Sequence, residues 1–344
     1  MFVRWDNLTI QEEEQRLPGY RDPAAVRRFE APEALDMRFY EVQAKSALNR
    51  VPEQSRMPFR WTVNPYRGCS HACVYCFARP THTFLGFDAG RDFEREIVVK
   101  VNAPEVLRAE LARPSWRREH VALGTNTDPY QWVEGRYKLM RGIWEALRDA
   151  CNPCSILTKS PLLLRDLDLM LEIAERVPFT ACLSIPTLDQ KVWRETEPHT
   201  PNPRARLEAV AELNRAGIPT GVLIAPLMPG INDAPEQIEP LLEAAAQAGA
   251  TNIGGATLHL RGEVRDVFLG WMRQSRPDLL SRYGELYRRR AYAPQAERER
   301  LQRMVRRGGS PGAFWRNGND RSEDRRQADI FGNTPLRQLQ TTLF

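Results

Sequence analysis

The sequence predicts an α/β protein whose core is a partial (β/α)6 TIM-like barrel, with an N-terminal extension and a helical C-terminal extension. From Arg60 onward, short β-branched apolar runs alternate with amphipathic segments of helical period, which is typical of repeated βα units around a parallel sheet. Six such runs can be counted, fewer than a closed barrel needs. At 344 residues, of which 42% are hydrophobic, the chain is long enough for such a barrel and can bury a core.

The predicted strands and helices alternate along this core. The strands are expected at residues 61–64, 120–125, 155–158, 180–185, 221–225 and 252–258. Apolar residues fall on one helical face at 140–147 and at 207–211, as expected of helices that cross between parallel strands. Asp233 with Glu236 three residues later matches a capping box, so a further helix is expected to begin at Asp233 and to run to about Gly249.

The predicted domain layout follows from where this alternation begins and stops. Residues 1–58 mix charged residues with scattered aromatics and show no sustained period, so we interpret them as an extension on the surface. The barrel core is expected to span residues 59–262, followed by a helical C-terminal region at 263–308. The tail at 309–344 is rich in Arg and Gly, and we expect it to be loosely ordered.

Composition bounds the compartment and the partners. No apolar run reaches the roughly 18 residues that span a bilayer, and the N-terminus turns acidic where a signal peptide would stay apolar, so a cytoplasmic protein with no membrane partner is expected. Thiols stay reduced in that compartment, and the six cysteines are interpreted as metal ligands, catalytic groups or core residues. The net charge of +5 is compatible with nucleic acid, but arginine-rich stretches such as 303–307 also suit solvated helix faces.

The segment that decides the chemistry follows the first predicted strand and reads NPYRGCSHACVYCFAR. Cys69, Cys73 and Cys76 place three thiolates on one tight loop. Three thiolates can hold three irons of a four-iron four-sulfur (4Fe-4S) cluster and leave the remaining iron open for chemistry. The alternative is a structural zinc site, in which His71 or His82 completes a closed Cys3His set. The unpaired CxxxC spacing and the barrel-like chain behind the loop favour the cluster.

Together with GTNTDPYQ, LTKSPLLLRDLDLM and SIPTLD farther along the chain, this loop resembles the radical S-adenosylmethionine (SAM) superfamily, and within it the group related to spore photoproduct lyase. The resemblance spans roughly residues 45–300. It implies an enzyme with a 4Fe-4S cluster and SAM as cofactors, which reductively cleaves SAM to a 5′-deoxyadenosyl radical that acts on an unidentified substrate by lyase-like or modification chemistry. It also implies a reductant protein such as flavodoxin or ferredoxin as partner, and nucleic acid as a candidate substrate. The alternative is a zinc-binding or non-catalytic metal-loop protein that binds nucleic acid.

The resemblance also assigns SAM contacts to particular residues. Tyr75, just before the third cysteine, corresponds to the aromatic residue that approaches the adenine. Thr127 and Asp128 end the second predicted strand and are expected to contact SAM, although Asp-Pro is also a common turn opener. Lys159 is expected to meet the SAM carboxylate, with a solvated lysine as the alternative. Ser184, near the end of the fourth strand, is expected to contact SAM unless it only packs beneath a helix.

The catalytic residues stay unknown at this level. In the spore photoproduct lyase group a cysteine at the end of the second strand returns a hydrogen atom to the product radical, whereas the corresponding stretch at 125–128 contains no cysteine. Cys182 and Tyr130 are candidates for that role, and a buried apolar cysteine is the alternative for Cys182. Cys151 and Cys154 form a CxxC at the opposite end of the predicted barrel, where turn chemistry explains the spacing and a redox pair or second metal site is the alternative.

Overall fold

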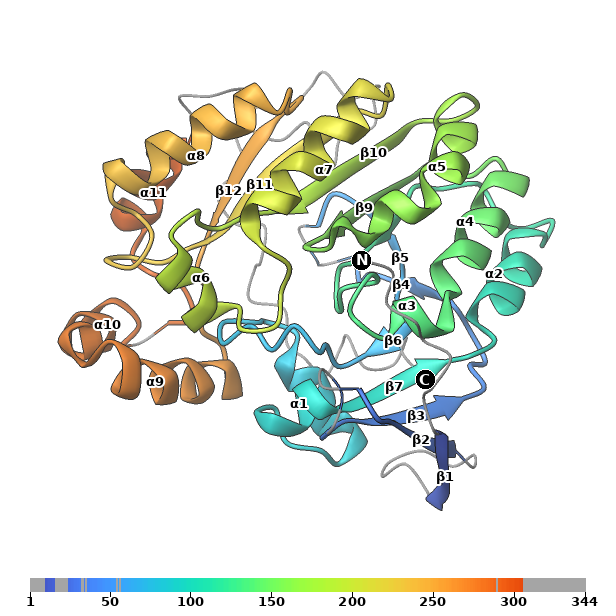
Figure 1. Ribbon diagram of the computed structural model, residues 1–344, viewed down its shortest axis with the longest axis horizontal. Helices are drawn as coiled ribbons and strands as arrows, with labels where there is room; N and C mark the ends of the chain where they lie inside the picture. Colours follow the sequence, from blue (N-terminus) through green and yellow to red (C-terminus); the bar gives the residue numbers. More distant parts are fainter. Residues whose placement is uncertain are drawn as a thin grey trace.

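The main sheet of the protein has seven strands in the order β12-β11-β10-β9-β8-β5-β4 (Figure 1). The computed structural model describes residues 10–15, 24–31, 34, 36–53, 55, 57–288 and 290–305. The strands are β4 (Leu48–Arg50), β5 (Trp61–Val63), β8 (Val121–Leu123), β9 (Cys154–Thr158), β10 (Phe179–Ser184), β11 (Thr220–Leu227) and β12 (Ile253–Thr257). All pair in parallel except β4, which runs antiparallel to β5. Each predicted strand region therefore contains a strand, and within the described residues the sheet does not close between β12 and β4.

Helices cover the outer face of this sheet (Figure 1). The longer ones are α2 (Ala103–Leu111), α4 (Leu139–Asp149), α5 (Leu167–Ala174), α7 (Pro203–Arg215) and α8 (Pro235–Gln247). Shorter segments are η1 (Arg79–Leu85), α1 (Arg91–Arg95), α3 (Glu134–Tyr137), η2 (Pro161–Asp166) and α6 (Gln190–Thr196). The apolar face predicted at 140–147 is buried against the sheet, with Trp144 fully inaccessible. The main core thus lies between the helices and the sheet, and leaves the other face of the sheet to the site.

The predicted capping box at the start of α8 is wrong. The helix begins at Pro235, its N-cap is Ala234, and no side chain caps it. Asp233 instead accepts the N–H of Gly230 (2.6 Å) and forms an ion pair with Arg300. An arginine from a distant helix and a turn amide outcompete the local cap, because a charged donor makes the stronger hydrogen bond.

A second sheet combines three strands from residues 10–42, where the sequence indicated no regular period, with two strands from within the predicted barrel core. Its strands are β1 (Ile10–Gln15), β2 (Ala24–Phe29), β3 (Arg38–Val42), β6 (Tyr66–Arg67) and β7 (Glu96–Lys100), in the order β1-β2-β3-β7-β6. Val26 and Phe39 are fully buried in this layer. These strands are short and carry many charges, so the sequence shows no clear alternation of apolar and polar residues. The sheet becomes apparent only in the structure, where β7 pairs with β3. Because β6 leads directly into the cysteine loop, this sheet supports the site.

The C-terminal part is helical, as predicted, within the described residues. It contains α9 (Glu263–Ser275), η3 (Pro277–Leu279), α10 (Leu280–Leu286) and α11 (Gln295–Val305). Phe268, Met272, Tyr283 and Tyr287 form a second core there. No described helix is both long and apolar enough to cross a membrane. The predicted loose tail at 309–344 lies outside the described residues.

Candidate active site

The cysteine loop leaves β6 through backbone conformations that few residues adopt. Gly68 has a φ of +80°, and a Cβ at this position would lie 2.8 Å from the carbonyl oxygen of Phe93. That same carbonyl accepts the amide N–H of Cys69 (3.0 Å). Ala72 also has a positive φ of 54°, which turns the chain just before Cys73. The protein's own backbone contacts therefore set the course of the loop.

All three thiols of the loop line one cavity of about 290 Å³. Other lining residues follow β8 and lie at the carboxyl ends of β9 and β10, and β11, β12 and α11 complete the lining. The cavity therefore opens at the carboxyl ends of several parallel strands. Active sites of parallel barrels lie at this end. Tyr75, Thr127, Asp128, Lys159 and Ser184, the residues predicted to bind SAM, all line the same cavity. The structure thus brings the predicted site together.

Arg79 holds the cysteine loop through hydrogen bonds to its backbone. Its side chain is fully buried, and its Nε and Nη2 donate to the carbonyl of Cys73 (3.0 and 2.9 Å). Nη2 also donates to the carbonyl of Ala72 (3.2 Å), while Nη1 donates to the carbonyls at 89–90 (3.1 and 2.8 Å). The ion pair with Glu94 balances the charge. A planar guanidinium suits this task because it offers five donors in a fixed geometry.

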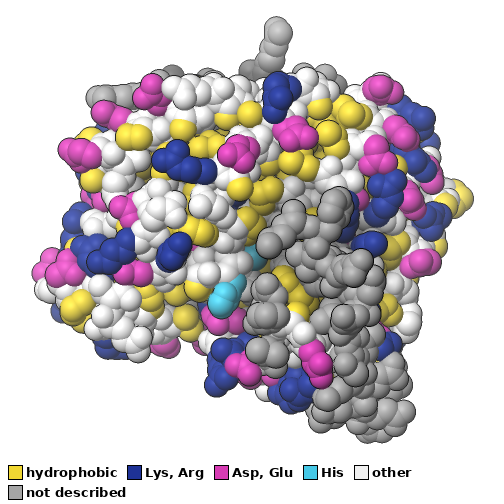
Figure 2. All heavy atoms as spheres, viewed as in Figure 1, with side chains coloured by type: hydrophobic (Ala, Val, Ile, Leu, Met, Phe, Trp, Pro, Cys, Tyr) yellow, Lys and Arg dark blue, Asp and Glu magenta, His cyan; other side chains and the backbone are white. Residues whose placement is uncertain are grey.

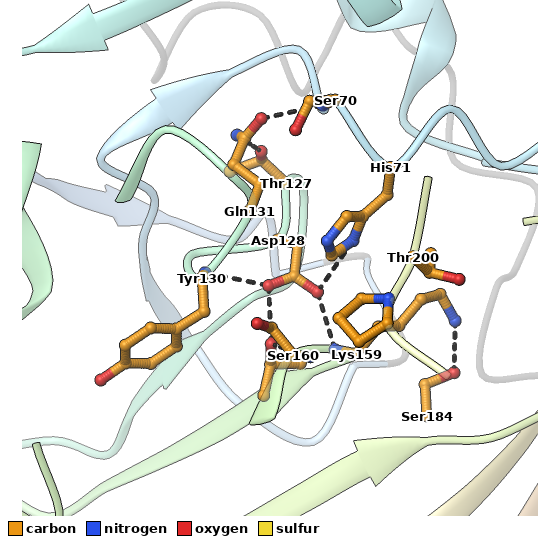
Figure 3. Close-up of polar contacts among 12 residues, drawn as sticks. Ser70, His71, Thr127, Asp128, Tyr130, Gln131, Lys159, Ser160, Ser184 and Thr200 are labelled. Atoms are coloured by element: carbon orange, nitrogen blue, oxygen red, sulfur yellow. Dashed lines mark hydrogen bonds and ion pairs between the residues drawn. The ribbon is translucent and has the colours of Figure 1, made fainter. Parts of the chain in front are cut away.

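Asp128 joins the cysteine loop to the ends of β8 and β9 (Figure 3). Its carboxylate accepts the Thr158 hydroxyl (2.6 Å) and the backbone N–H groups of Lys159 (2.7 Å) and Tyr130 (2.9 Å). His71 of the loop approaches the other side, with Nδ1 3.4 Å from Oδ2. Burial would raise the pKa of Asp128, but His71 and these hydrogen bonds lower it to about 2. Asp128 is therefore an anionic junction between loop and sheet.

Thr127 braces the same loop. Its hydroxyl donates to the carbonyl of Gly68 (2.6 Å) and accepts from Nε2 of Gln131 (3.1 Å). Oε1 of Gln131 in turn accepts the N–H of Ser70 (2.8 Å; Figure 3). Both residues assigned to SAM at this strand end thus have structural partners within the protein, and their contact with SAM stays a prediction.

Lys159 is a largely buried lysine, not a solvated one. Its Nζ donates to Oγ of Ser184 (2.6 Å; Figure 3) and lies 2.9 Å from Oε1 of Glu197. The Tyr75 ring lies beneath this ammonium, with its centroid 5.7 Å from Nζ, and the Tyr75 hydroxyl donates to Glu197. The side chain is 15% exposed, so its charge faces the cavity from within the protein.

Several site residues were not found from the sequence. Glu197 and Arg206 are fully buried, yet Glu197 directly follows α6 and Arg206 lies near the start of α7, in a stretch so rich in polar residues that both side chains look solvated. Arg79 and Gln131 do lie within the segments that carry the resemblance, at the ends of the CFAR and DPYQ motifs. Their position at the end of a motif marks these two residues, but it does not indicate what either side chain does.

The cysteine loop fits an iron-sulfur cluster better than a single metal ion. Within the described part of the chain, no three His, Cys, Asp or Glu side chains converge as a single-ion site requires. In a cubane site each thiolate binds a different iron, so the sulfurs lie farther apart than around one zinc ion. The histidines of the zinc alternative have other partners, since His82 bonds to a backbone carbonyl and His71 contacts Asp128. Burial raises the pKa of Cys73, and that of Cys76 to about 11, so their thiolates need the nearby cationic charge that a bound metal, iron or zinc, supplies.

Comparison with known proteins agrees with this geometry. Residues 63–245 match the family described as the Radical SAM superfamily. The chain belongs to the radical SAM superfamily. This radical SAM protein is 50% identical over 289 residues to uncharacterized proteins of Mycobacterium bovis and Mycobacterium tuberculosis, covering 84% of its own length and 85% of theirs. A protein of Acidianus two-tailed virus is 30% identical over 209 residues, 59% of this chain and 68% of the viral one.

Solved structures give the same fold. Spore photoproduct lyase complexed with dinucleoside spore photoproduct aligns with a TM-score of 0.57 at 16% identity, covering 78% of each chain. The predicted resemblance and the α/β fold class are therefore confirmed. The protein is a radical SAM enzyme, and its superfamily uses SAM with an iron-sulfur cluster.

Neither candidate hydrogen-atom donor is among the residues that line the cavity of this radical SAM enzyme. Cys182 is buried in β10 and is not among the residues that line the cavity, although it precedes Ser184 by two positions. Tyr130 lies in the helix-side core, where its hydroxyl donates to Asp166 (2.8 Å) and accepts from Nε1 of Trp144 (2.7 Å). Among the described lining residues, the cysteines are those of the loop alone. The catalytic role of either candidate stays a prediction, which these positions do not favour.

The CxxC pair lies at the other end of β9. Cys154, the first residue of that strand, is fully buried in the main core. Cys151 sits in the turn after α4 with a φ of 47°. Burial in the core and a place in a turn are what the turn-and-core interpretation expects, and the alternative of a redox pair or second metal site stays a prediction.

Proposed function

We propose that Cys69, Cys73 and Cys76 bind a 4Fe-4S cluster and that SAM binds in the adjoining cavity. Its amino and carboxylate groups would bind the one iron that has no cysteine ligand. The observation that carries this proposal is the convergence of the three loop cysteines with Lys159 and Ser184 on one cavity. When bound, the reduced cluster supplies the electron that cleaves the sulfonium bond of SAM to methionine and a 5′-deoxyadenosyl radical. A reductant protein such as flavodoxin or ferredoxin would deliver that electron.

The chain's own residues prepare the cavity for SAM. The ammonium of Lys159 has three N–H groups, and its contacts with Ser184 and Glu197 occupy two of them. The third is available for a carboxylate, which is the chemistry that the amino-acid end of SAM offers. Leu157, Leu223 and neighbouring apolar residues line much of the rest of the cavity, and such a lining keeps water from a reactive intermediate.

Nucleic acid is the substrate class that one observation favours. His259, which lines the cavity, packs against the Tyr292 ring with the ring centroids 4.3 Å apart, and the Arg298 guanidinium lies 5.6 Å above Tyr292. Aromatic rings with an adjacent cation are typical of surfaces that bind nucleobases. Among the described residues on the face shown in Figure 2, however, Lys and Arg side chains are interspersed with Asp and Glu and form no continuous basic surface for phosphates.

Anaerobic reconstitution tests the proposed cofactors. We expect about four irons per chain and 5′-deoxyadenosine that forms only with both SAM and dithionite. Cys73→Ala should abolish both, whereas Cys151→Ala, a matched control at the other end of the sheet, should abolish neither. A colourless, zinc-loaded protein, or unchanged 5′-deoxyadenosine from Cys73→Ala, would contradict the proposal.

A separate measurement tests the substrate class. Binding of single-stranded DNA and RNA oligonucleotides should weaken steeply with salt, because phosphate contacts release counterions. It should also weaken in Tyr292→Ala, which removes the ring between His259 and Arg298. Absence of salt-dependent binding would instead favour a small-molecule or peptide substrate.

A further inference from the structure

The buried carboxylate of Glu197 connects three segments of the chain next to the residues that line the cavity. Glu197 directly follows α6 and is fully buried. Its backbone carbonyl accepts both the N–H (3.2 Å) and the hydroxyl (2.9 Å) of Thr200. The preceding carbonyl, of Thr196, accepts the N–H of Val74 in the cysteine loop (3.1 Å). The end of α6 is therefore tied to the loop, and the Glu197 side chain starts from a fixed backbone.

The carboxylate of Glu197 has three strong partners from different parts of the chain. Oε1 lies 2.9 Å from Nζ of Lys159, and Oε2 lies 2.8 Å from Nη2 of Arg206. The hydroxyl of Tyr75, in the cysteine loop, donates to Oε1. Glu197 is thus where β9, α7 and the cysteine loop meet, although it is not among the residues that line the cavity.

The charges of this cluster leave one cation for the cavity. Arg206 is fully buried, and its other N–H groups donate within the protein, including to the carbonyl of Ser184 (2.9 Å). Arg206 therefore neutralises Glu197 and has no access to a ligand. Burial would raise the pKa of Glu197, but Arg206 and Lys159 lower it to about 2, so the carboxylate stays ionised. The unbalanced positive charge belongs to Lys159, the charged member of this cluster that lines the cavity.

We infer that Glu197 is a positioning residue, which holds the Lys159 ammonium in the direction that a ligand carboxylate requires. This inference rests on the proposed SAM site. Glu197 and Ser184 are the two acceptors that fix Nζ of Lys159. Without the carboxylate, Lys159 and Arg206 become neighbouring cations with no anion between them, and their repulsion turns the ammonium away.

A cluster that only stabilises the fold is the competing explanation, and ligand chemistry separates the two. Glutamine at position 197 keeps the shape and an oxygen that accepts the Tyr75 hydroxyl, but it loses the charge that holds Lys159. A positioning role therefore predicts weaker binding only of ligands that carry the carboxylate. A purely structural role predicts lower stability with no preference between ligands.

The test compares SAM with 5′-methylthioadenosine, which lacks the amino-acid portion. Affinities are measured by equilibrium dialysis on cluster-loaded protein without reductant, so that no turnover occurs, and the iron content is measured in parallel. In Glu197→Gln, the Kd for SAM should rise about tenfold or more, as expected for a lost charge-assisted hydrogen bond, while the Kd for 5′-methylthioadenosine and the iron content stay unchanged. Glu195→Gln, in α6 two residues before Glu197, is the matched control and should change neither affinity.

Glu197→Asp keeps the charge but shortens its reach, and should show the same selective loss for SAM to a smaller extent. It carries the test if Glu197→Gln does not fold. An unchanged Kd for SAM, or equal weakening of both ligands, overturns the positioning role. Iron-loaded wild-type protein that binds no SAM overturns the proposed function itself, and the inference with it.

Discussion

Replacing Arg79 with methionine is expected to lower the free energy of unfolding by about 3–5 kcal/mol, the range for removing one partner of a buried ion pair. The guanidinium is fully buried and donates to four backbone carbonyls as well as to Glu94. Each buried carbonyl that loses its donor costs about 1–3 kcal/mol. Small shifts of the loop and entry of water offset part of that cost, which keeps the expected total below the simple sum. Methionine fills most of the same volume, so the loss reports on hydrogen bonds and charge rather than on a cavity.

Urea unfolding of the protein without its cluster, in anaerobic reducing buffer, measures this change at constant m-value. Arg91→Met is a matched control, because Arg91 is 71% exposed and lies 3.9 Å from Asp36. That exposed pair should contribute less than about 1 kcal/mol. Arg79→Met should also retain less iron after reconstitution, since the carbonyls it holds include those of Ala72 and Cys73 in the cysteine loop. A change in unfolding free energy no larger than that of the control would refute the reasoning.

Three further predictions test other parts of the site. Asp128→Asn should cost about 1–3 kcal/mol at pH 7, because Asp128 accepts three hydrogen bonds within the protein. The pKa of Asp128 is about 2 in the folded protein and about 3.9 in the unfolded chain, so its ionised carboxylate stabilises the fold above pH 3.9, and this stabilisation is lost as the pH falls toward 2. Urea unfolding at several pH values should therefore show that the free energy of unfolding falls less steeply with acid in the variant than in the wild type. Gly124→Ala should lower the free energy of unfolding by at least about 2 kcal/mol, because φ is +79° and the new Cβ would lie 1.8 Å from the Leu157 carbonyl oxygen. In the control Gly270→Ala, in α9, the new Cβ meets nothing within 4 Å, so this variant should gain about 0.5–1 kcal/mol of stability, and thermal melts compare the two. Cys182→Ala should leave iron content and 5′-deoxyadenosine formation unchanged, since Cys182 does not line the cavity, and a lower iron content or a lower 5′-deoxyadenosine yield would contradict this placement.

The local parts of the fold and site could be predicted from the sequence. The six parallel strands were found because buried strands are continuous apolar runs, and that signal does not depend on distant partners. The cysteine loop was found because its three ligands lie within eight residues, so their spacing alone constrains the chemistry. Lys159 and Ser184 were found because each ends or follows a strand, where a parallel barrel presents its active site.

Other features depend on partners that are distant in sequence. The prediction that Asp233 caps α8 was wrong because Arg300, from another helix, binds the same carboxylate. The second sheet was missed because β3 acquires a partner on its second edge only from β7, 58 residues later at the paired positions Arg38 and Glu96. Neither competition nor pairing at such a separation leaves a periodic trace in the chain.

By itself, the sequence determined that this chain folds as a parallel α/β protein and carries a three-cysteine loop, because apolar periodicity and ligand spacing are properties of neighbouring residues. Only the tertiary structure decided which polar groups hold that loop and its lysine in place. Glu197 meets Tyr75 across 122 positions of sequence, and such a contact exists only once helix, strand and loop have packed together. Burial then gives the contact its strength, because a charge removed from water must find its partners within the protein.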